Sequence, residues 1–180
     1  MFRPFFLLCY KIFGWKINGS LPPEKKYLCC IAPHTSNWDF LVGVAARSIL
    51  RITGAKFLGK SQLFRAPYGW IFRAIGGIPV ERTERHDMVE QVSAIIRNSD
   101  EFILAIAPEG TRRKVTKLKT GFWYIARSAG IPIVPVGLDF KKREVVIGKP
   151  LYTTDIDSDI HILMEFYRGI TGRNPELGID

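Results

Sequence analysis

Apolar and polar positions alternate along this chain in two rhythms. Short apolar runs bounded by glycine, proline or charged residues predict strands at residues 27–32, 55–58, 78–80, 102–107, 133–136 and 144–147. Between them, apolar residues recur at helical spacing and predict helices at 38–50, 68–75, 85–98, 121–129 and 158–170. This order predicts an α/β fold: a single domain with a largely parallel central sheet covered by helices on both faces, and ligand sites beyond the carboxyl ends of the strands.

The first seventeen residues have a different pattern. They hold ten large apolar residues and the cations Arg3, Lys11 and Lys16, and no acidic residue precedes Glu24. The charges interrupt the apolar run well before the ~20 residues that a membrane-spanning helix needs. Residues 1–17 are therefore predicted to form an amphipathic membrane-surface helix whose cations face anionic headgroups, with 18–180 as the folded domain. A terminal helix packed on that domain is the alternative.

Composition narrows the class of protein. A chain of 180 residues with 47% hydrophobic residues can bury one continuous core. Lysine and arginine number 26 against 17 aspartates and glutamates, so the net charge of +9 favours an anionic partner such as a phosphorylated ligand, an acidic carrier protein, nucleic acid or an anionic membrane. Cys9, Cys29 and Cys30 form neither a disulfide framework nor a metal-binding spacing, which fits a reducing cytoplasmic setting. No nucleic-acid-binding module is recognisable.

A histidine and an aspartate follow the first predicted strand of this domain. His34 stands just beyond the strand, and Asp39 follows it at the start of a predicted helix. A neutral histidine can accept a proton near pH 7, and a carboxylate at its other ring nitrogen fixes the tautomer and stabilises the imidazolium. We interpret the two residues as a candidate general base and its orienting partner. Alternatively, Asp39 only complements the positive end of the helix.

A second polar group follows the predicted strand 102–107. Here Glu109 is followed by Gly110, Thr111 and Arg112, and further cations extend to residue 119. Glycine allows a ligand to approach the backbone, threonine offers hydroxyl and amide donors, and arginine can bind a phosphate through two parallel hydrogen bonds. Arg82, at the end of the strand 78–80, is expected at the same edge of the sheet. A solvated basic turn and a solvated strand end are the alternatives.

Three further sequence patterns argue against a phosphate-binding loop, a calcium site and a serine nucleophile. Residues 54–61 match the phosphate-loop pattern, but a helical pattern precedes them and they include a predicted strand in place of a flexible loop. Residues 155–159 begin like a calcium loop and lack its glycine and glutamate. No G-x-S-x-G nucleophile motif occurs. The chain thus offers a base without a nucleophile of its own, which suits acyl transfer to an alcohol substrate without a cofactor or metal.

Four motifs in order carry a family resemblance. They are H-x4-D at 34–39, G-x-I-x-x-x-R at 76–82, P-E-G-T-R at 108–112 and a V-P-I-x-P-type block at 131–136. In this order they resemble the glycerolipid acyltransferase family, which includes 1-acyl-glycerol-3-phosphate acyltransferases. The resemblance covers about residues 25 to 150. It implies that His34 is the general base and Asp39 its orienting partner. It also implies an acceptor-binding site lined by Asn37, Arg82, Glu109, Gly110, Thr111 and Arg112.

The resemblance implies a specific reaction. A fatty acyl group moves from a thioester donor, acyl-CoA or acyl carrier protein, to the free hydroxyl of a lysophospholipid, with lysophosphatidate giving phosphatidate as the foremost case. The protein is expected to bind peripherally to the cytoplasmic face of an anionic membrane. Acylation of glycerol 3-phosphate, another lysophospholipid or an amino-acid-based lipid stays open. A non-enzymatic basic domain that binds a membrane surface or a polyanion is the alternative outside this chemistry.

Overall fold

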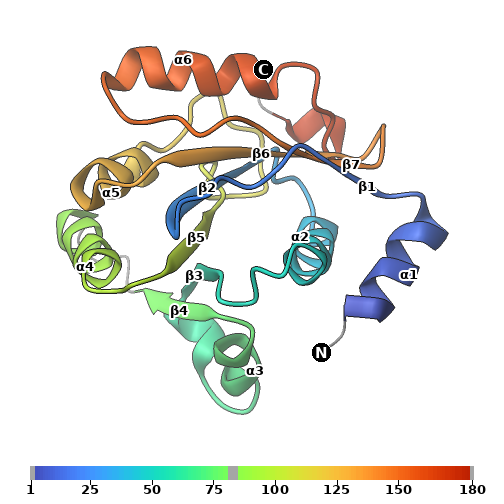
Figure 1. Ribbon diagram of the computed structural model, residues 1–180, viewed down its shortest axis with the longest axis horizontal. Coiled ribbons are helices and arrows are strands. Elements are labelled where there is room, and N and C mark those ends of the chain that lie inside the picture. Colours follow the sequence, from blue (N-terminus) through green and yellow to red (C-terminus); the bar gives the residue numbers. More distant parts are fainter. Residues whose placement is uncertain (1–2, 81–84, 179–180) are drawn as a thin grey trace.

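A sheet with the strand order β1-β7-β6-β2-β5-β3-β4 runs through the centre of the described molecule (Figure 1). The computed structural model describes residues 3–80 and 85–178. The strands are β1 (Lys16–Asn18), β2 (Lys26–Ala32), β3 (Lys56–Lys60), β4 (Gly77–Val80), β5 (Phe102–Ile106), β6 (Ile133–Asp139) and β7 (Glu144–Ile147). β2 to β6 run parallel to their neighbours among these five, whereas β7 runs antiparallel to β6 and parallel to β1.

Helices cover both faces of this sheet. They are α1 (Arg3–Phe13), α2 (Trp38–Ile49), α3 (Gly69–Ala74), α4 (Arg85–Arg97), α5 (Gly121–Ala129) and α6 (Ile156–Tyr167), with 3-10 turns η1 (Ser61–Phe64) and η2 (Pro175–Leu177). Figure 1 shows α6 on one side of the sheet and α2 on the other. Alternate residues of β2 account for the two layers, because successive side chains of a strand point to opposite faces. Leu28 and Cys30 pack with α4, α5 and α6, whereas Tyr27 and Cys29 pack with α1 and α2. The predicted fold class is confirmed.

The position of β2 in the sheet explains why an apolar run in the sequence correctly predicts this strand. β2 lies between β5 and β6, with Leu28 opposite Leu104 on one side and Ile133 on the other. A strand covered on both faces reads as a continuous apolar run rather than an alternating one. β3 in turn occupies Lys56–Lys60, inside the stretch that matches a phosphate-loop pattern. Because a strand replaces the flexible loop, the sequence-based rejection of that pattern agrees with the fold.

The amino-terminal segment differs in part from the sequence-based description. The helix ends at Phe13, and residues 16–18 form β1 at the edge of the sheet, a strand that the sequence did not predict. The Tyr10 hydroxyl is buried and donates to the carbonyl of Val42 in α2 at 2.9 Å. One side of α1 therefore packs on the domain. Within residues 3–80 and 85–178, no helix is long and apolar enough to cross a membrane.

Candidate active site

His34 and Asp39 face each other across the short loop that joins β2 to α2. β2 ends at Ala32 and α2 begins at Trp38, so this loop lies at the carboxyl edge of β2. The Nδ1 atom of His34 lies 3.1 Å from Oδ2 of Asp39, and the two side chains are 22% and 1% exposed. A buried carboxylate thus meets one nitrogen of a partly exposed imidazole. The structure brings together the pair that the sequence singled out.

Backbone donors hold Asp39 in place. The N–H groups of Thr35 and Ser36 donate to Oδ2 of Asp39 at 2.7 and 2.8 Å. Asp39 also lies in the first turn of α2, where the helix dipole favours a negative charge. A carboxylate only accepts hydrogen bonds, so in the neutral imidazole of His34 the proton lies on Nδ1 beside Asp39 and Nε2 has a lone pair. This arrangement is the one that general-base catalysis requires.

Glu109 reaches the same loop from the neighbouring strand. It follows β5, which pairs with β2, and its Oε2 accepts a hydrogen bond from the backbone N–H of His34 at 2.7 Å. The residue is 1% exposed, and burial raises the pKa of its carboxyl to about 7. Oε1 of Glu109 and Oδ1 of Asp39 are buried without a hydrogen-bond partner in the described part of the chain. Glu109 thus links two loops from inside the fold.

The backbone beyond Glu109 forms a basic loop at the surface. Gly110 has φ +64°, and a Cβ atom there would lie 2.7 Å from Nζ of Lys119, so a larger residue would displace this ammonium group. The N–H of Lys119 donates to the carbonyl of Pro108 at 2.8 Å and closes the base of the loop. Arg112 is exposed on the loop. Flexible cations beside a glycine turn are suited to binding a phosphate group.

The other predicted site residues lie around this centre. Thr111 is half-buried, and its hydroxyl oxygen accepts a hydrogen bond from the N–H of Arg113 at 3.3 Å. Asn37 is exposed at the N-cap of α2, where its side chain makes no capping hydrogen bond. Arg82 lies outside the described residues. For these residues, as for Glu109, contact with an acceptor remains a prediction.

Two residues of the site had no assigned role in the sequence analysis. Thr35 is 2% exposed, and it receives two hydrogen bonds from Asn174: the Asn174 N–H donates to Oγ1 of Thr35, and its side-chain amide donates to the carbonyl of Thr35. Asn174 is 139 positions away along the chain. No local pattern could have indicated this contact, because it depends on how the carboxyl-terminal segment folds back.

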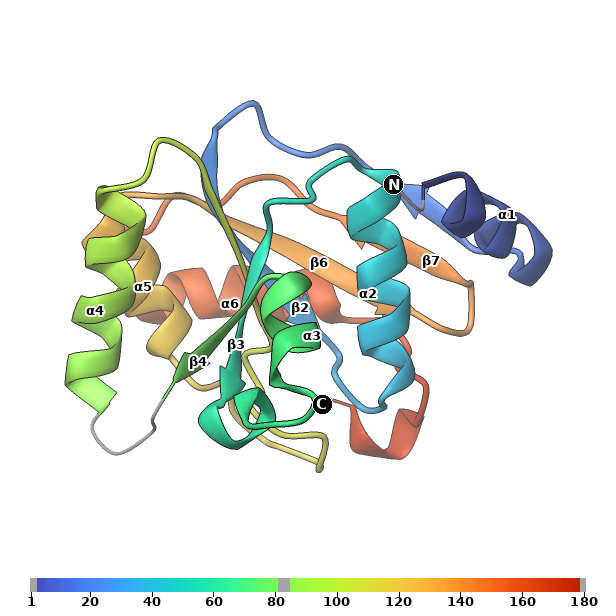
Figure 2. The ribbon, with the colours of Figure 1, turned by 90° about the horizontal axis from the view of Figure 1, so that it is seen from below.

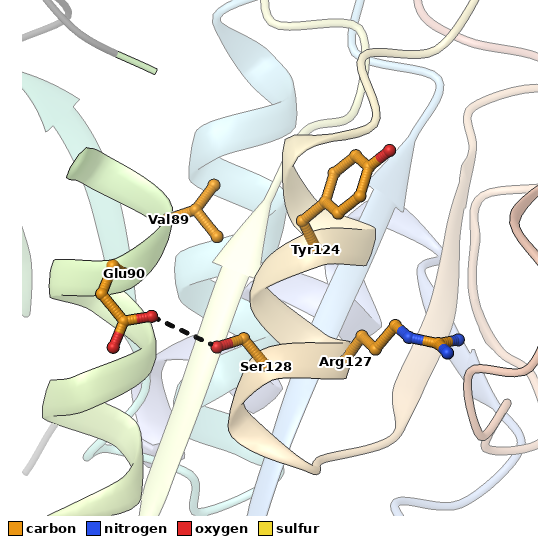
Figure 3. Close-up of a pocket in the computed structure, with 5 residues that line it drawn as sticks. All are labelled: Val89, Glu90, Tyr124, Arg127 and Ser128. Carbon is orange, nitrogen blue, oxygen red and sulfur yellow. Dashed lines mark hydrogen bonds between the residues drawn. The ribbon is translucent and has the colours of Figure 1, made fainter. Parts of the chain in front are cut away.

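A pocket elsewhere contains none of the predicted site residues. It lies between α4 and α5 and is lined by Val89, Glu90, Tyr124, Arg127 and Ser128 (Figure 3). Glu90 and Ser128 point toward each other, and the Ser128 hydroxyl donates to Oε2 of Glu90 at 3.5 Å. Arg127 points away from both. The Glu90 carboxylate is exposed and forms an ion pair with Arg97 at 2.5 Å, so we assign catalysis to the loop after β2.

Comparison with known proteins identifies the family of this chain. A family model described as acyltransferase matches residues 16–139, from the start of β1 to the end of β6. The chain belongs to the acyltransferase family. The family resemblance that the four ordered motifs indicated is confirmed. The matched range includes His34, Asp39 and Glu109, whereas Thr171–Asn174 and the whole of α6 lie beyond it.

Two curated relatives show how similar this chain is to individual members of the family. The chain is 31% identical over 137 residues to the 1-acyl-sn-glycerol-3-phosphate acyltransferase of Haemophilus influenzae, covering 71% of this chain and 55% of the relative. It is 28% identical over 146 residues to the enzyme of that name from Salmonella typhimurium, covering 77% of this chain and 58% of the relative. The chain thus spans a little over half the length of these two relatives.

A solved structure supports the fold of the family. The crystal structure of the 1-acyl-sn-glycerophosphate acyltransferase of Thermotoga maritima matches with a TM-score of 0.59 and 20% sequence identity. The match covers 95% of this chain and 79% of that chain. At this identity the likeness concerns the fold alone. It extends through nearly the whole length of this chain, including regions beyond the family-model match.

Proposed function

We propose that this protein transfers a fatty acyl group from a thioester donor to the free hydroxyl of a lysophospholipid, with lysophosphatidate as the acceptor and phosphatidate as the product. The observation that carries the proposal is the 3.1 Å contact between Nδ1 of His34 and Asp39, which leaves Nε2 as a base at the carboxyl edge of the sheet. The names of the relatives from Haemophilus influenzae and Salmonella typhimurium support lysophosphatidate as the acceptor.

The reaction needs no nucleophile from the protein. Nε2 of His34 takes the proton of the acceptor hydroxyl while that oxygen attacks the thioester carbonyl. The carbonyl oxygen becomes an oxyanion, which hydrogen-bond donors in the site stabilise. The tetrahedral intermediate then expels the thiolate, and the imidazolium of His34 returns the proton to its sulfur. The products are an ester and a free thiol, and Asp39 stabilises the charged imidazole between the two steps.

The acceptor phosphate is proposed to bind at the basic loop after β5. Arg112 is exposed there, and Gly110 brings the backbone and Lys119 close together. Arginine binds phosphate through its planar guanidinium group, and backbone amides add further donors. Thr111, Asn37 and Arg82 complete the proposed acceptor site, as the resemblance implies. The donor is acyl-CoA or acyl carrier protein. Both are anionic, and the net charge of +9 favours binding of an anionic donor.

The test is thioester consumption with a panel of acceptors. We would supply acyl-CoA and acyl carrier protein in turn, together with lysophosphatidate, glycerol 3-phosphate or a neutral lysolipid, and use His34→Ala as the blank. Turnover with lysophosphatidate that falls about 10²–10⁴-fold in the variant is expected. Turnover with another acceptor would keep the mechanism and replace the substrate. Absence of turnover with both donors, together with salt-sensitive binding to polyanions, would favour the non-enzymatic alternative.

The same proposal places the protein on the cytoplasmic face of an anionic membrane. Sixteen large hydrophobic side chains are exposed in the described part of the chain, and twelve of them lie on α1, on α2 or between residues 61 and 74. These helices lie on the same side of the sheet (Figure 1, Figure 2). Exposed large hydrophobic residues gathered on one side of a protein favour a binding surface. Trp38, Tyr68 and Trp70 are exposed on it, and such amphipathic rings favour the headgroup level of a bilayer.

Charge supports an anionic lipid as the partner of this surface. Residues 3–80 contain eleven lysines and arginines but only two acidic residues, Glu24 and Asp39. Asp39 is buried, so it adds no exposed negative charge. Basic residues near a bilayer surface each contribute about 1 kcal/mol of attraction to anionic lipids. Helix α1 is proposed as one part of this surface and not the whole of it.

A pair of matched variants tests the membrane proposal. Ile12 on α1 and Ile162 on α6 are 67% and 50% exposed, on opposite sides of the sheet. Ile12→Glu should weaken flotation with vesicles of phosphatidylglycerol and phosphatidylcholine, whereas Ile162→Glu should not. Equal flotation of both variants and the unchanged protein would remove α1 from the proposed surface. Trp70→Ala extends the test to α3.

A further inference from the structure

The carboxyl-terminal segment returns to the catalytic edge of the sheet after α6. The N–H of Phe140, just beyond β6, donates to the carbonyl of Thr171 at 2.8 Å, which ties the segment to the end of that strand. Figure 2 shows the segment near η2 and the loop before α2 at the same edge of the molecule. Four residues after α6 ends, the chain is thus already anchored beside the loop that carries His34.

The segment lies against this loop without room for a side chain at Gly172. A Cβ atom at Gly172 would lie 2.8 Å from Oγ1 of Thr35 and 3.2 Å from Cγ of Pro33. Real Cβ atoms do not approach other atoms as closely as the first of these distances, so the backbone of Gly172 lies directly against the side chains of Thr35 and Pro33. Gly172 is itself buried. The segment therefore packs on the residues on either side of His34.

Asn174 supplies directed bonds in addition to this packing. Its N–H donates to Oγ1 of Thr35 at 3.1 Å, and its side-chain amide donates to the carbonyl oxygen of Thr35 at 2.9 Å. The N–H of Thr35 in turn donates to Oδ2 of Asp39 at 2.7 Å. Thr35 is thus held on one side by Asn174 and on the other by the carboxylate that contacts His34.

We propose that Asn174 is a positioning residue for catalysis: through Thr35 it fixes the orientation of the His34–Asp39 pair. The inference rests on the proposed function, because His34 must be the base for its orientation to affect turnover. It goes beyond the family match, which ends at residue 139. A residue outside the matched range therefore completes the geometry of the His34–Asp39 motif.

The physical reason is the sensitivity of proton transfer to geometry. A catalytic group must be held within about 0.5 Å and 10–20° of its productive position by its supporting contacts. Without the amide of Asn174, the Thr35 carbonyl loses its directed donor, and the Thr35–Ser36 peptide is held less firmly, through the Ser36 N–H on Asp39. A misplacement of about 1 Å can lower a rate by as much as 10²-fold. The loss falls on kcat, since Asn174 is not proposed to touch the acceptor.

Three variants test the role. Asn174→Ala removes the amide donor, and Asn174→Asp keeps the shape while placing an oxygen against the Thr35 carbonyl. Asn98→Ala, at an exposed asparagine after α4, is the matched control. Both Asn174 variants should lower kcat about 10-fold with KM changed less than twofold, and Asn98→Ala should change neither. Circular dichroism and thermal unfolding establish that the compared proteins are folded.

The decisive measurement combines Asn174→Ala with His34→Ala. If Asn174 acts through His34, adding its substitution should leave the residual rate of His34→Ala unchanged, because effects of residues that act as a unit are not additive. A further 10-fold loss in the double variant, or full activity of both folded Asn174 variants, would overturn the positioning role alone. Wild-type turnover that survives His34→Ala, or no wild-type turnover at all, would overturn the proposed function and the inference together.

Discussion

Two loops at the carboxyl edge of the sheet differ in how firmly they are held. In the loop from His34 to Asp39, two backbone N–H groups and the imidazole converge on one carboxylate oxygen, and the backbone of His34 is itself bonded to Glu109. In the loop from Gly110 to Lys119, the closing bond joins Lys119 to Pro108, and Arg112 extends into solvent. One loop is internally bonded and partly buried, and the other is open and basic.

The difference separates two tasks of the proposed reaction. Proton transfer requires a base that stays in one orientation, so a network of short hydrogen bonds suits it. Binding a phosphate requires charge within reach, and flexible cations supply that without a fixed geometry. Substitutions in the bonded loop should therefore lower kcat, and substitutions in the basic loop should raise KM. The three predictions below test this division from the largest catalytic effect to the smallest.

The largest effect is expected at Asp39. Asp39→Asn should lower kcat by about 10²–10⁴-fold with little change in KM, because an amide can present a donor to Nδ1 of His34 and so favour the unproductive tautomer. Steady-state kinetics with saturating thioester donor measure both constants. Asp155→Asn is the control, since Asp155 caps α6 at a different place in the fold. A rise in KM without a fall in kcat at Asp39 would contradict the division between the loops.

A smaller effect is expected at Arg112. Arg112→Ala should raise KM for a phosphorylated acceptor about 10-fold, which corresponds to about 1.4 kcal/mol, close to the lower end of the range for hydrogen bonds to charged groups. The kcat should change less than threefold, and KM for a neutral lysolipid should not change. Lys141→Ala, at an exposed lysine after β6, is the charge-matched control. Equal effects of Arg112→Ala on phosphorylated and neutral acceptors would remove Arg112 from the phosphate site.

The two loops also differ in how well sequence indicates them. His34 and Asp39 stand at one strand-to-helix turn, so their spacing along the chain places them in contact. The parallel sheet was predictable for a similar reason, because buried central strands read as apolar runs. The strand β1, the antiparallel direction of β7 and the contact of Asn174 with Thr35 were not predictable, since each depends on pairing between distant segments.

Glu109 illustrates what the P-E-G-T-R motif does not indicate, which is the direction of each side chain. The sequence indicates an acidic residue in a basic loop, and the resemblance assigns it to the acceptor site. The motif does not specify which side chain of the loop turns inward. In the structure Glu109 is buried, with its Oε2 on the backbone of His34. Along the chain, Glu109 immediately precedes the basic loop. Its contacts, however, are with the loop that carries His34. Substitutions of Glu109 therefore test directly whether the two loops have separate effects on kcat and KM.

The smallest catalytic effect is therefore expected for Glu109→Gln. The amide oxygen of glutamine can still accept the hydrogen bond from His34, so kcat and KM should each change less than threefold at pH 7. Glu109→Leu removes the acceptor and should lower kcat further while KM stays constant. A 10-fold rise in KM for Glu109→Gln, similar to that of Arg112→Ala, would instead place the carboxylate on the acceptor, as the sequence-based assignment has it.

The pH dependence of the unfolding free energy tests independently whether Glu109 is buried. Burial raises the pKa of Glu109 from 4.5 to about 7, so between these pH values the folded protein binds a proton that the unfolded chain has released. This group therefore favours folding less as the pH rises from about 5 to about 8, by up to about 3 kcal/mol. Urea unfolding of the unchanged protein and of Glu109→Gln should show the variant gaining relative stability over that range. If the difference in unfolding free energy between the two proteins does not change with pH, Glu109 is solvated. Its carboxylate would then not be the buried group that holds the backbone of His34.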